Sequence, residues 1–204
     1  MVDFKSTQKH EADSWLIEDP LVREEKAQRE TVRYPLIAKQ MGLNHLDTSN
    51  MTVWDIGCGP LGGVSSVINA RHIVRIDPLG VEYAKQYPQV SMLALKAEEL
   101  KEKLSQPDLI IITNALDHFE SPAQFLQDLT KYMKYGSYFS HLHAINNAYS
   151  HPHEAHAHNV NPELFKEYLE DSFETCWSMN FQHDGLTYGW RKQRAFSGLY
   201  RKIK

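Results

Sequence analysis

The segment Val53–Gly63 places a glycine-rich turn directly after a short apolar run that contains one acid, Asp55. A helical pattern begins near Gly62, so the segment predicts a strand, a tight loop and the N-terminal end of a helix. Glycine has no Cβ, so a ligand can lie directly against the backbone of this loop. The helix end would add free N–H groups and a partial positive charge. The segment therefore predicts a binding site for a nucleotide-like cofactor.

The spacing of Gly57, Gly59 and Gly62 satisfies the dinucleotide-binding fingerprint. Asp77 ends the next apolar segment, about 20 residues further on, where an acid can accept hydrogen bonds from ribose hydroxyls. Both features suit NAD and S-adenosylmethionine equally. Asp55 favours S-adenosylmethionine, because a carboxylate beside the loop repels a pyrophosphate and attracts an amino group or a sulfonium. A glycine turn that binds no ligand is the remaining alternative.

Composition limits the class of protein. The chain has 204 residues, 42% hydrophobic and 24% charged, which is typical of one globular domain that is soluble. The net charge of −4 does not favour a nucleic-acid partner. The two cysteines, Cys58 and Cys176, indicate no disulfide framework and fit a reducing compartment. Because we find no signal peptide near Met1–Trp15 and no long apolar run, we expect a cytoplasmic protein without a membrane segment.

The pattern of apolar residues predicts two N-terminal helices followed by alternating strands and helices. The helices cover about 8–17 and 19–41, the second bent or broken near Pro35 and ended by Gly42. The run Leu109–Ile112 is purely apolar, which suits a parallel strand buried on both faces. The last two strands are expected to pair antiparallel. We predict strands at 52–56, 72–76, 90–95, 108–113, 138–144, 174–182 and 195–203, and further helices at 62–70, 80–86, 98–104, 122–133 and 162–169.

Three motifs resemble those of the class I S-adenosylmethionine-dependent methyltransferases. Val53–Gly59 is similar to the first motif of that family, Arg75–Asp77 to its ribose-binding acid, and Pro107–Pro122 to its fourth strand and following loop. The resemblance covers about Val53 to Ile203. It implies an α/β fold of the Rossmann-like, doubly wound type. The sheet would have seven strands, mostly parallel, with an antiparallel C-terminal strand. It also implies one domain over 1–204, with a helical cap at 1–45, a cofactor-binding core at 46–204 and a substrate loop at 144–162.

The resemblance implies roles for individual residues of this chain. Gly57 and Gly59 would lie against the methionine and ribose parts of the cofactor, and Asp55 would hold the amino group. The full set of implied cofactor-binding residues is Asp55, Gly57, Cys58, Gly59, Asp77, Pro78, Ala97, Glu98, Asn114 and Ala115. Two positions depart from the family pattern. Leu61 stands where the family often has glycine, and Lys96 stands where it often has an aspartate that faces the adenine amine.

Histidines gather in the second half of the chain, with six between His141 and His158. The loop after the fifth predicted strand lies at the carboxyl edge of the sheet, near the expected site. A histidine suits removal of a proton from an acceptor, because its ordinary pKa is close to neutral. Our candidates for this base are His118, His143, His153 and His158.

Two other readings of the histidines stay open. His141 and His143 share one face of a strand, so they can be packing residues. The histidines of the loop can be solvated groups. A bound metal is the less favoured reading. Asp117, Glu154 and His118 would then add ligands, but no fixed spacing such as His-Glu-x-x-His occurs.

The sequence therefore predicts an enzyme that moves the methyl group of S-adenosylmethionine to a small-molecule or glycan-like acceptor, most favourably at oxygen, and releases S-adenosylhomocysteine. N-terminal helices often cover the acceptor pocket in this family, so Trp15 and Tyr34 are expected to line it. We expect a monomer or a homodimer. The alternatives are an NAD-dependent oxidoreductase, a non-catalytic subunit that binds S-adenosylmethionine and activates a partner, and a metal-binding protein built on the histidine loop.

Overall fold

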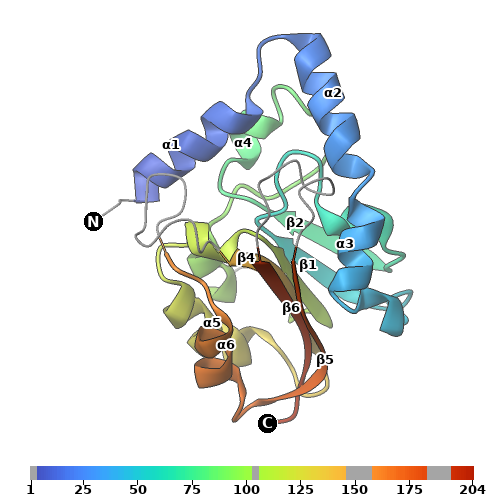
Figure 1. The fold of residues 1–204 in the computed structure, drawn as a ribbon, viewed down its shortest axis with the longest axis vertical. Coiled ribbons are helices and arrows are strands. Elements are labelled where there is room, and N and C mark those ends of the chain that lie inside the picture. The colour runs from blue at the N-terminus through green and yellow to red at the C-terminus, as the bar shows by residue number, and fades with distance from the viewer. Residues whose placement is uncertain (1–3, 103–105, 146–157, 183–193) are drawn as a thin grey trace.

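The strands form one mixed sheet in a computed structural model that describes residues 4–102, 106–145, 158–182 and 194–204 (Figure 1). Within these residues the sheet has six strands, in the order β2-β1-β3-β4-β6-β5. The first four are parallel, β6 is antiparallel to β4, and β5 is antiparallel to β6. The strands are β1 (Thr52–Ile56), β2 (His72–Ile76), β3 (Leu109–Thr113), β4 (Tyr138–Ile145), β5 (Phe173–Gln182) and β6 (Arg194–Lys202). The predicted α/β sheet with antiparallel C-terminal strands is confirmed.

The prediction of a seventh strand at 90–95 is wrong for the described residues. Only Leu93 pairs there, through a single parallel bridge to Ile76. The Leu93 amide donates to Arg75 O at 2.8 Å, and the Asp77 amide donates to Leu93 O at 3.0 Å. The Leu95 amide then donates back to Leu93 O at 3.0 Å, which bends the chain away from β2. Pairing ends at this bend, so an apolar segment of strand-like composition does not extend the sheet.

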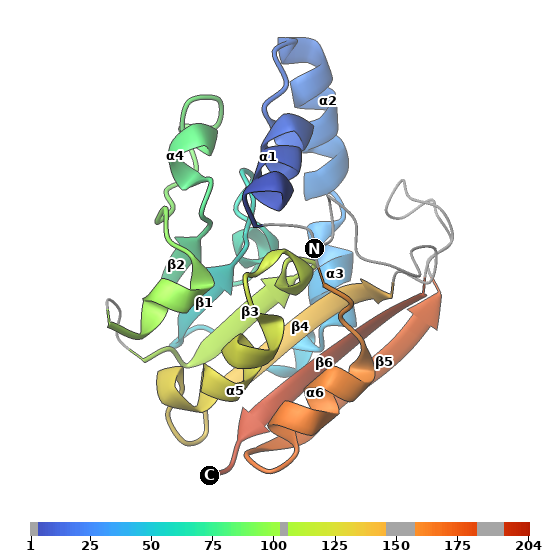
Figure 2. The same cartoon turned by 90° about the vertical axis from the view of Figure 1, so that its left-hand side faces the viewer.

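Helices cover both faces of the sheet (Figure 2). One face packs against α5 (Pro122–Tyr132), α6 (Pro162–Leu169) and the 3₁₀ segment η3 (Ala97–Glu102). The other packs against α3 (Tyr34–Gln40), η1 (Leu43–His45) and η2 (Val64–Val67). The apolar strand β3 sends Ile110 and Ile112 into the first core and Leu109 and Ile111 into the second. Burial on both faces of this strand, as predicted, makes β3 the centre of the fold.

Proline sets the boundaries of the N-terminal helices. The structure has α1 (Phe4–Trp15), α2 (Pro20–Thr31) and α3, so the expected helix at 19–41 is broken between Thr31 and Tyr34. Pro35 lies in the first turn of α3, where its missing N–H costs no helical hydrogen bond. Gly42 has a φ of +74° and ends α3, as predicted. The Asp19 side chain accepts from the first amides of α2 and caps it.

The prediction of a helix at 62–70 is wrong in length. Only the four-residue 3₁₀ segment η2 forms there. Gly62 and Gly63 have positive φ values of +80° and +58°, so no right-handed helix can begin at either residue. Ile68 is already extended, with φ −101° and ψ 147°. The glycine loop therefore has no long helix behind it, and a helix dipole is not part of this site.

The helices α1 and α2 lie beyond the ends of β1 and β3 toward which their arrows point (Figure 2). Those ends are the carboxyl ends, where the parallel strands β1 to β4 meet at one edge. α2 has no buried residue, so it covers this edge as an outer layer. A short helix, α4 (Gly80–Tyr83), follows β2 at the same edge.

No helix among the described residues is long and apolar enough to cross a membrane.

Candidate functional site

A glycine loop joins β1 to η2 at the carboxyl edge of the sheet. Gly57 has a φ of +69°, and a Cβ built there would lie 2.3 Å from the Ala115 Cβ, so only glycine fits. Gly59 has a φ of +64°, and nothing lies within 4 Å of a Cβ built on it. The Gly57 amide donates to Ile76 O at 2.8 Å, which ties the loop to the end of β2. Backbone at Gly59 is therefore open to close approach by a ligand.

Asp55 is fully enclosed at the end of β1, with 1% of its surface exposed. Its Oδ2 accepts a hydrogen bond from the Ser65 amide at 2.9 Å, which holds η2 against the strand. Burial raises the pKa of Asp55 to about 6, and the hydrogen bonds from Ser65 act in the opposite direction. The carboxylate is therefore a buried negative charge that a cationic ligand group would stabilise.

Asp77 follows β2 and holds the glycine loop from the other side. Its Oδ2 accepts from the Gly59 amide at 3.0 Å, and its Oδ1 accepts from the Leu79 amide at 2.9 Å. Burial raises its pKa to about 6, and the charge of Glu11 adds to that rise while His118 opposes it. Because each oxygen keeps a further lone pair, Asp77 can still accept bonds from a ligand.

Asn114 begins the loop after β3 in a backbone conformation that is rare for a residue with a side chain, with a φ of +50°. Its amide donates to Leu142 O at 2.7 Å, and its Oδ1 accepts from the Ala144 amide at 3.2 Å. These bonds fix the ends of β3 and β4 side by side. Such strained residues cluster at functional sites.

Lys96 occupies the position where the family often has an aspartate, and acidic side chains surround it. Its Nζ lies 2.5 Å from Glu120 Oε1, and its amide donates to Glu99 Oε2 at 3.1 Å. The Glu120 amide donates in turn to Glu98 Oε1 at 3.0 Å. This exposed network joins the start of η3 to the loop before α5 and forms one wall of the site.

A cavity of about 400 Å³ connects these elements. Of the residues predicted for cofactor binding, all ten line it, so the structure brings together Asp55, Gly57, Cys58, Gly59, Asp77, Pro78, Ala97, Glu98, Asn114 and Ala115. Trp15 and Tyr34, which were expected to line an acceptor pocket, also line this cavity. The floor of the cavity is the carboxyl edge of the sheet, and its roof is formed by α1, α2 and α3.

Several lining residues were missed in the sequence. On the roof they include Gln8, His10, Glu11, Ser14, Lys26, Arg29 and Glu30, and near the strands they include Phe119, Leu142 and Ala144. Gln8, Glu11 and Trp15 are spaced three and four residues apart, which places them on one face of a helix. That spacing was the available signal, but charged and polar residues on a helix more often form a solvated face.

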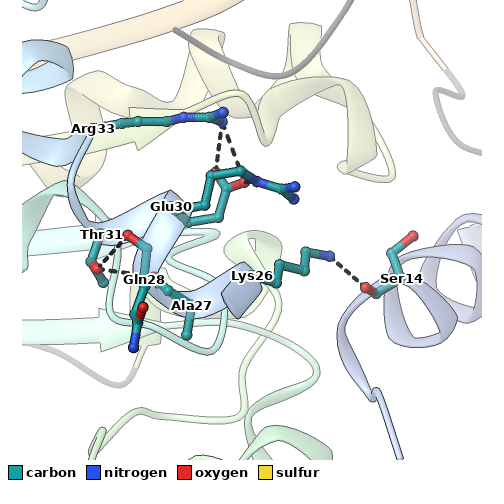
Figure 3. A network of polar contacts seen from close by, with 8 residues as sticks. Ser14, Lys26, Ala27, Gln28, Glu30, Thr31 and Arg33 are labelled. Atoms are coloured by element: carbon teal, nitrogen blue, oxygen red, sulfur yellow. Dashed lines mark hydrogen bonds and ion pairs between the residues drawn. The ribbon is translucent and has the colours of Figure 1, made fainter. Parts of the chain in front are cut away.

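The roof is held together by polar contacts between α1 and α2 (Figure 3). Lys26 Nζ donates to the Ser14 carbonyl and lies 3.8 Å from the centre of the Trp15 ring. Partial burial lowers the pKa of Lys26, and the nearby charges of Glu11 and Glu30 oppose that effect. Arg33 Nη1 donates to both carboxylate oxygens of Glu30 at 3.3 Å, close to the turn between α2 and α3.

The four candidate bases lie in different places. His118, in η4 (Leu116–His118), lines the cavity, and its Nε2 is 3.6 Å from Asp117 Oδ1. His143 is buried in β4 and is not part of the cavity lining; burial lowers its pKa to about 4. His158 is partly exposed and also does not line the cavity. His153 lies outside the described residues.

The metal reading gains no support from the described part of the chain. No group of three or more His, Cys, Asp or Glu side chains in those residues is arranged to hold an ion. Glu154 and most of the histidine loop lie outside the described residues.

Known proteins of the methyltransferase families are similar to parts of this chain. A model of the methyltransferase domain matches residues 54–140. A ubiquinone biosynthesis O-methyltransferase of Rickettsia conorii is 31% identical over 124 residues, which is 56% of this chain. The match spans 42% of the length of that relative.

Solved structures of low sequence identity share the fold. The N-methyltransferase NodS of Bradyrhizobium japonicum, in complex with S-adenosylhomocysteine, gives a TM-score of 0.62 at 13% identity. The superposition covers 98% of this chain and 99% of NodS. A SAM-dependent methyltransferase of Methanosarcina mazei gives 0.61 at 15% identity, covering 79% of this chain and 96% of that one.

Proposed function

We propose that the chain is a class I S-adenosylmethionine-dependent methyltransferase that transfers the methyl group of S-adenosylmethionine to an oxygen atom of a small-molecule acceptor. The similarity to a methyltransferase domain model, to an O-methyltransferase and to the fold of NodS supports this proposal. The cavity carries this proposal, since it joins the glycine loop, two buried acids and two histidines, His10 of α1 and His118 of η4. Residues 1–45 act as the cap, 46–204 as the cofactor-binding core, and the loop at 144–162 as part of the acceptor side.

The cavity residues fit the cofactor in shape and charge. The space beside Gly59 admits a ligand against the backbone, and Asp55 and Asp77 offer buried negative charge to a ligand with an amino group and a sulfonium. Asp77 would accept from the ribose hydroxyls and Asp55 from the amino group. Gly57, Cys58 and Pro78 would lie along the ribose and methionine parts, Ala97 and Glu98 near adenine, and Asn114 and Ala115 near the methionine end.

The bound cofactor supplies an activated methyl group, so the work of the protein is alignment and removal of one proton. An imidazole nitrogen of His118 accepts the proton of the acceptor hydroxyl in this proposal. His118 is supported over the other candidates because it lines the cavity, and because Asp117 lies close enough to stabilise the imidazolium that forms. General-base assistance of this kind is worth roughly 10²- to 10⁴-fold in rate.

The acceptor side is partly apolar. Tyr34, Ile37 and Leu142 line the cavity beside the methionine end, and Trp15 adds a second aromatic side chain. The printed name of the Rickettsia relative, an O-methyltransferase of ubiquinone biosynthesis, supports oxygen as the accepting atom. A hydroxylated small molecule, aromatic or sugar-like, fits these features.

The test is a methyl-transfer assay with a panel of phenols, sugars and amines, after calorimetric titration with S-adenosylmethionine, S-adenosylhomocysteine and NAD. We expect binding of both adenosyl compounds and methyl transfer to a hydroxylated acceptor. His118→Gln is expected to lower kcat by roughly 10²- to 10⁴-fold with little change in the affinity for S-adenosylhomocysteine. His72→Gln, which changes an exposed histidine at the start of β2 outside the cavity lining, is the matched control and should keep its turnover.

Each part of the proposal can fail separately. Full turnover in His118→Gln would remove this residue as the base. Transfer to amines alone would remove oxygen as the accepting atom. A preference for NAD over both adenosyl compounds would overturn the proposed function itself.

A further inference from the structure

We infer that Glu11, on the roof helix α1, is a second ribose-binding carboxylate that acts together with Asp77. This inference rests on the proposed function, because it concerns the same cofactor. It assigns to the cap a direct role in reading the adenosine half of the ligand, in addition to covering the cavity.

Glu11 and Asp77 face the same space from opposite sides. Both line the cavity, Glu11 from α1 on the roof and Asp77 from the end of β2 on the floor. Glu11 Oε1 accepts a hydrogen bond from Trp15 Nε1 at 2.9 Å, one helical turn further along α1. That bond orients the carboxylate and leaves it further lone pairs for a ligand.

The two carboxylates are close enough to influence each other. The negative charge of Glu11 adds to the burial effect that raises the pKa of Asp77, and it also adds to the rise in the pKa of Tyr83, the last residue of α4. The charge of His118, from η4, acts on the pKa of Asp77 in the opposite direction. Lys26, from α2, is within range of Glu11. Repulsion between two acids across a cavity is relieved by a ligand that donates hydrogen bonds to both.

A vicinal diol has the matching chemistry. The two ribose hydroxyls of an adenosyl compound each carry one O–H donor, and ionised carboxylates are acceptors only. Charge-assisted bonds of this type are stronger than neutral ones. With the diol between them, Asp77 and Glu11 would each accept one such bond, and the acid of the floor would be joined to the roof through the ligand.

Gln8 gives an independent reason to expect a donor-rich ligand under α1. It lies three residues before Glu11, on the same face of the helix, and also lines the cavity. Its Oε1 is buried and has no hydrogen-bond partner within the described ranges. A buried acceptor without a partner is costly, and a ligand donor removes that cost. The underside of α1 is thus an acceptor surface.

The experiment is calorimetric titration of the full chain with two probes, S-adenosylhomocysteine and its 2′,3′-dideoxyribose analogue. Glu11→Gln keeps the size of the side chain and an oxygen for the bond from Trp15, but removes the charge. We expect it to bind S-adenosylhomocysteine about 10- to 100-fold more weakly than the unchanged protein, and the dideoxy analogue with equal affinity. Glu25→Gln, an exposed glutamate of α2 outside the cavity, is the control and should change neither affinity.

The outcomes separate this inference from the proposed function. If the unchanged protein does not bind S-adenosylhomocysteine, the proposed function fails, and the inference fails with it. If the unchanged protein binds but Glu11→Gln binds equally well, only the inference is wrong. An equal loss for both probes would also contradict it, because the effect would then not pass through the ribose hydroxyls. Matching unfolding midpoints for the two variants show that such a loss is not one of folding.

Discussion

Two pairs of buried titratable side chains lie in different regions of the sheet and differ in what surrounds them. Asp55 and Asp77 lie at the carboxyl edge, accept hydrogen bonds from backbone amides and line the cavity. His141 and His143 lie on β4 within the aromatic core under α6, where His141 stacks on Phe165 with ring centres 3.8 Å apart. Both nitrogens of His141 and Nε2 of His143 have no hydrogen-bond partner in the part of the chain that the structure describes.

Burial alone therefore does not mark a functional group. Both pairs have shifted pKa values, raised for the acids and lowered for the histidines, and in each case burial is the largest cause. Only the acids meet an open space and donors that hold them in place. The histidines pack as aromatic residues, one of the interpretations that the sequence left open, whereas the acids line the cavity, where we propose that they bind the cofactor.

The largest expected effect is on ligand binding. Asp77→Asn should weaken binding of S-adenosylhomocysteine by roughly 100-fold, because an amide has one acceptor oxygen and no charge for the ribose hydroxyls. His141→Phe should leave that affinity unchanged, because His141 does not line the cavity. Calorimetric titration of both variants measures the contrast. Equal losses in the two variants would break the comparison.

The next largest effect is on the free energy of unfolding. As the pH falls, the histidine pair should lower it and the aspartate pair should raise it. Burial lowers the folded-state pKa of each histidine, so its contribution to stability is complete above about pH 6.5 and is lost as the pH falls; for His143 the loss continues toward a pKa of about 4. At pH 5 the loss is about 2 kcal/mol for His143. The folded-state pKa values of Asp55 and Asp77 are raised to about 6, so the stability they contribute is present at low pH and is lost as the pH rises through about 6.

Urea unfolding of the cofactor-free protein at pH 8 and pH 5 separates these terms. Relative to the unchanged protein, His141→Phe should become more stable on going from pH 8 to pH 5, because burial lowers the pKa of His141 and phenylalanine does not titrate. Any cost of fitting the larger ring is the same at both pH values and cancels in this difference. An unchanged pH dependence in His141→Phe would show that this imidazole stays neutral or becomes solvated on protonation.

The smallest expected effect is the pH dependence of binding. A ligand that needs an ionised carboxylate of pKa about 6 should bind about tenfold more weakly at pH 5 than at pH 8, for each such group. Titration with S-adenosylhomocysteine from pH 8 to pH 5 measures this pH dependence. Asp77→Asn should remove the contribution of one of the two carboxylates. An affinity that stays constant from pH 8 to pH 5 would mean that neither acid binds the ligand in its charged form.

The sequence was most informative where a local pattern sufficed. Gly57, Gly59 and Asp77 could be placed together because parallel strands end at a common edge, and Pro35 and Gly42 marked helix boundaries through their backbone properties. The pattern of apolar residues gave wrong predictions for the strand at 90–95 and the helix after Gly63. The segment 90–95 has the apolar content of a strand but bends after one pair, and the helix after Gly63 stops because two glycines turn left-handed.

The roof of the site was the least predictable part. Glu11 and Lys26 look like ordinary solvated positions of amphipathic helices, and only the placement of α1 and α2 over the sheet brings them to the cavity. The contacts of the two strand histidines were equally unpredictable. Alternation predicted that His141 and His143 share a face of β4, but not that this face meets Phe165 and Phe196 and not the cavity.

The anchoring of α3 has a consequence for the order in which the chain folds. The carbonyl of Gln40 accepts bonds from Trp177 and Ser197, and that of Met41 accepts from Ser140, across separations of 99 to 157 residues. Contacts between residues so distant along the chain are slow to form, because a long loop must close first. During synthesis α3 therefore emerges before β5 and β6, the strands that anchor it. We expect its place beside the cavity to be fixed late in folding.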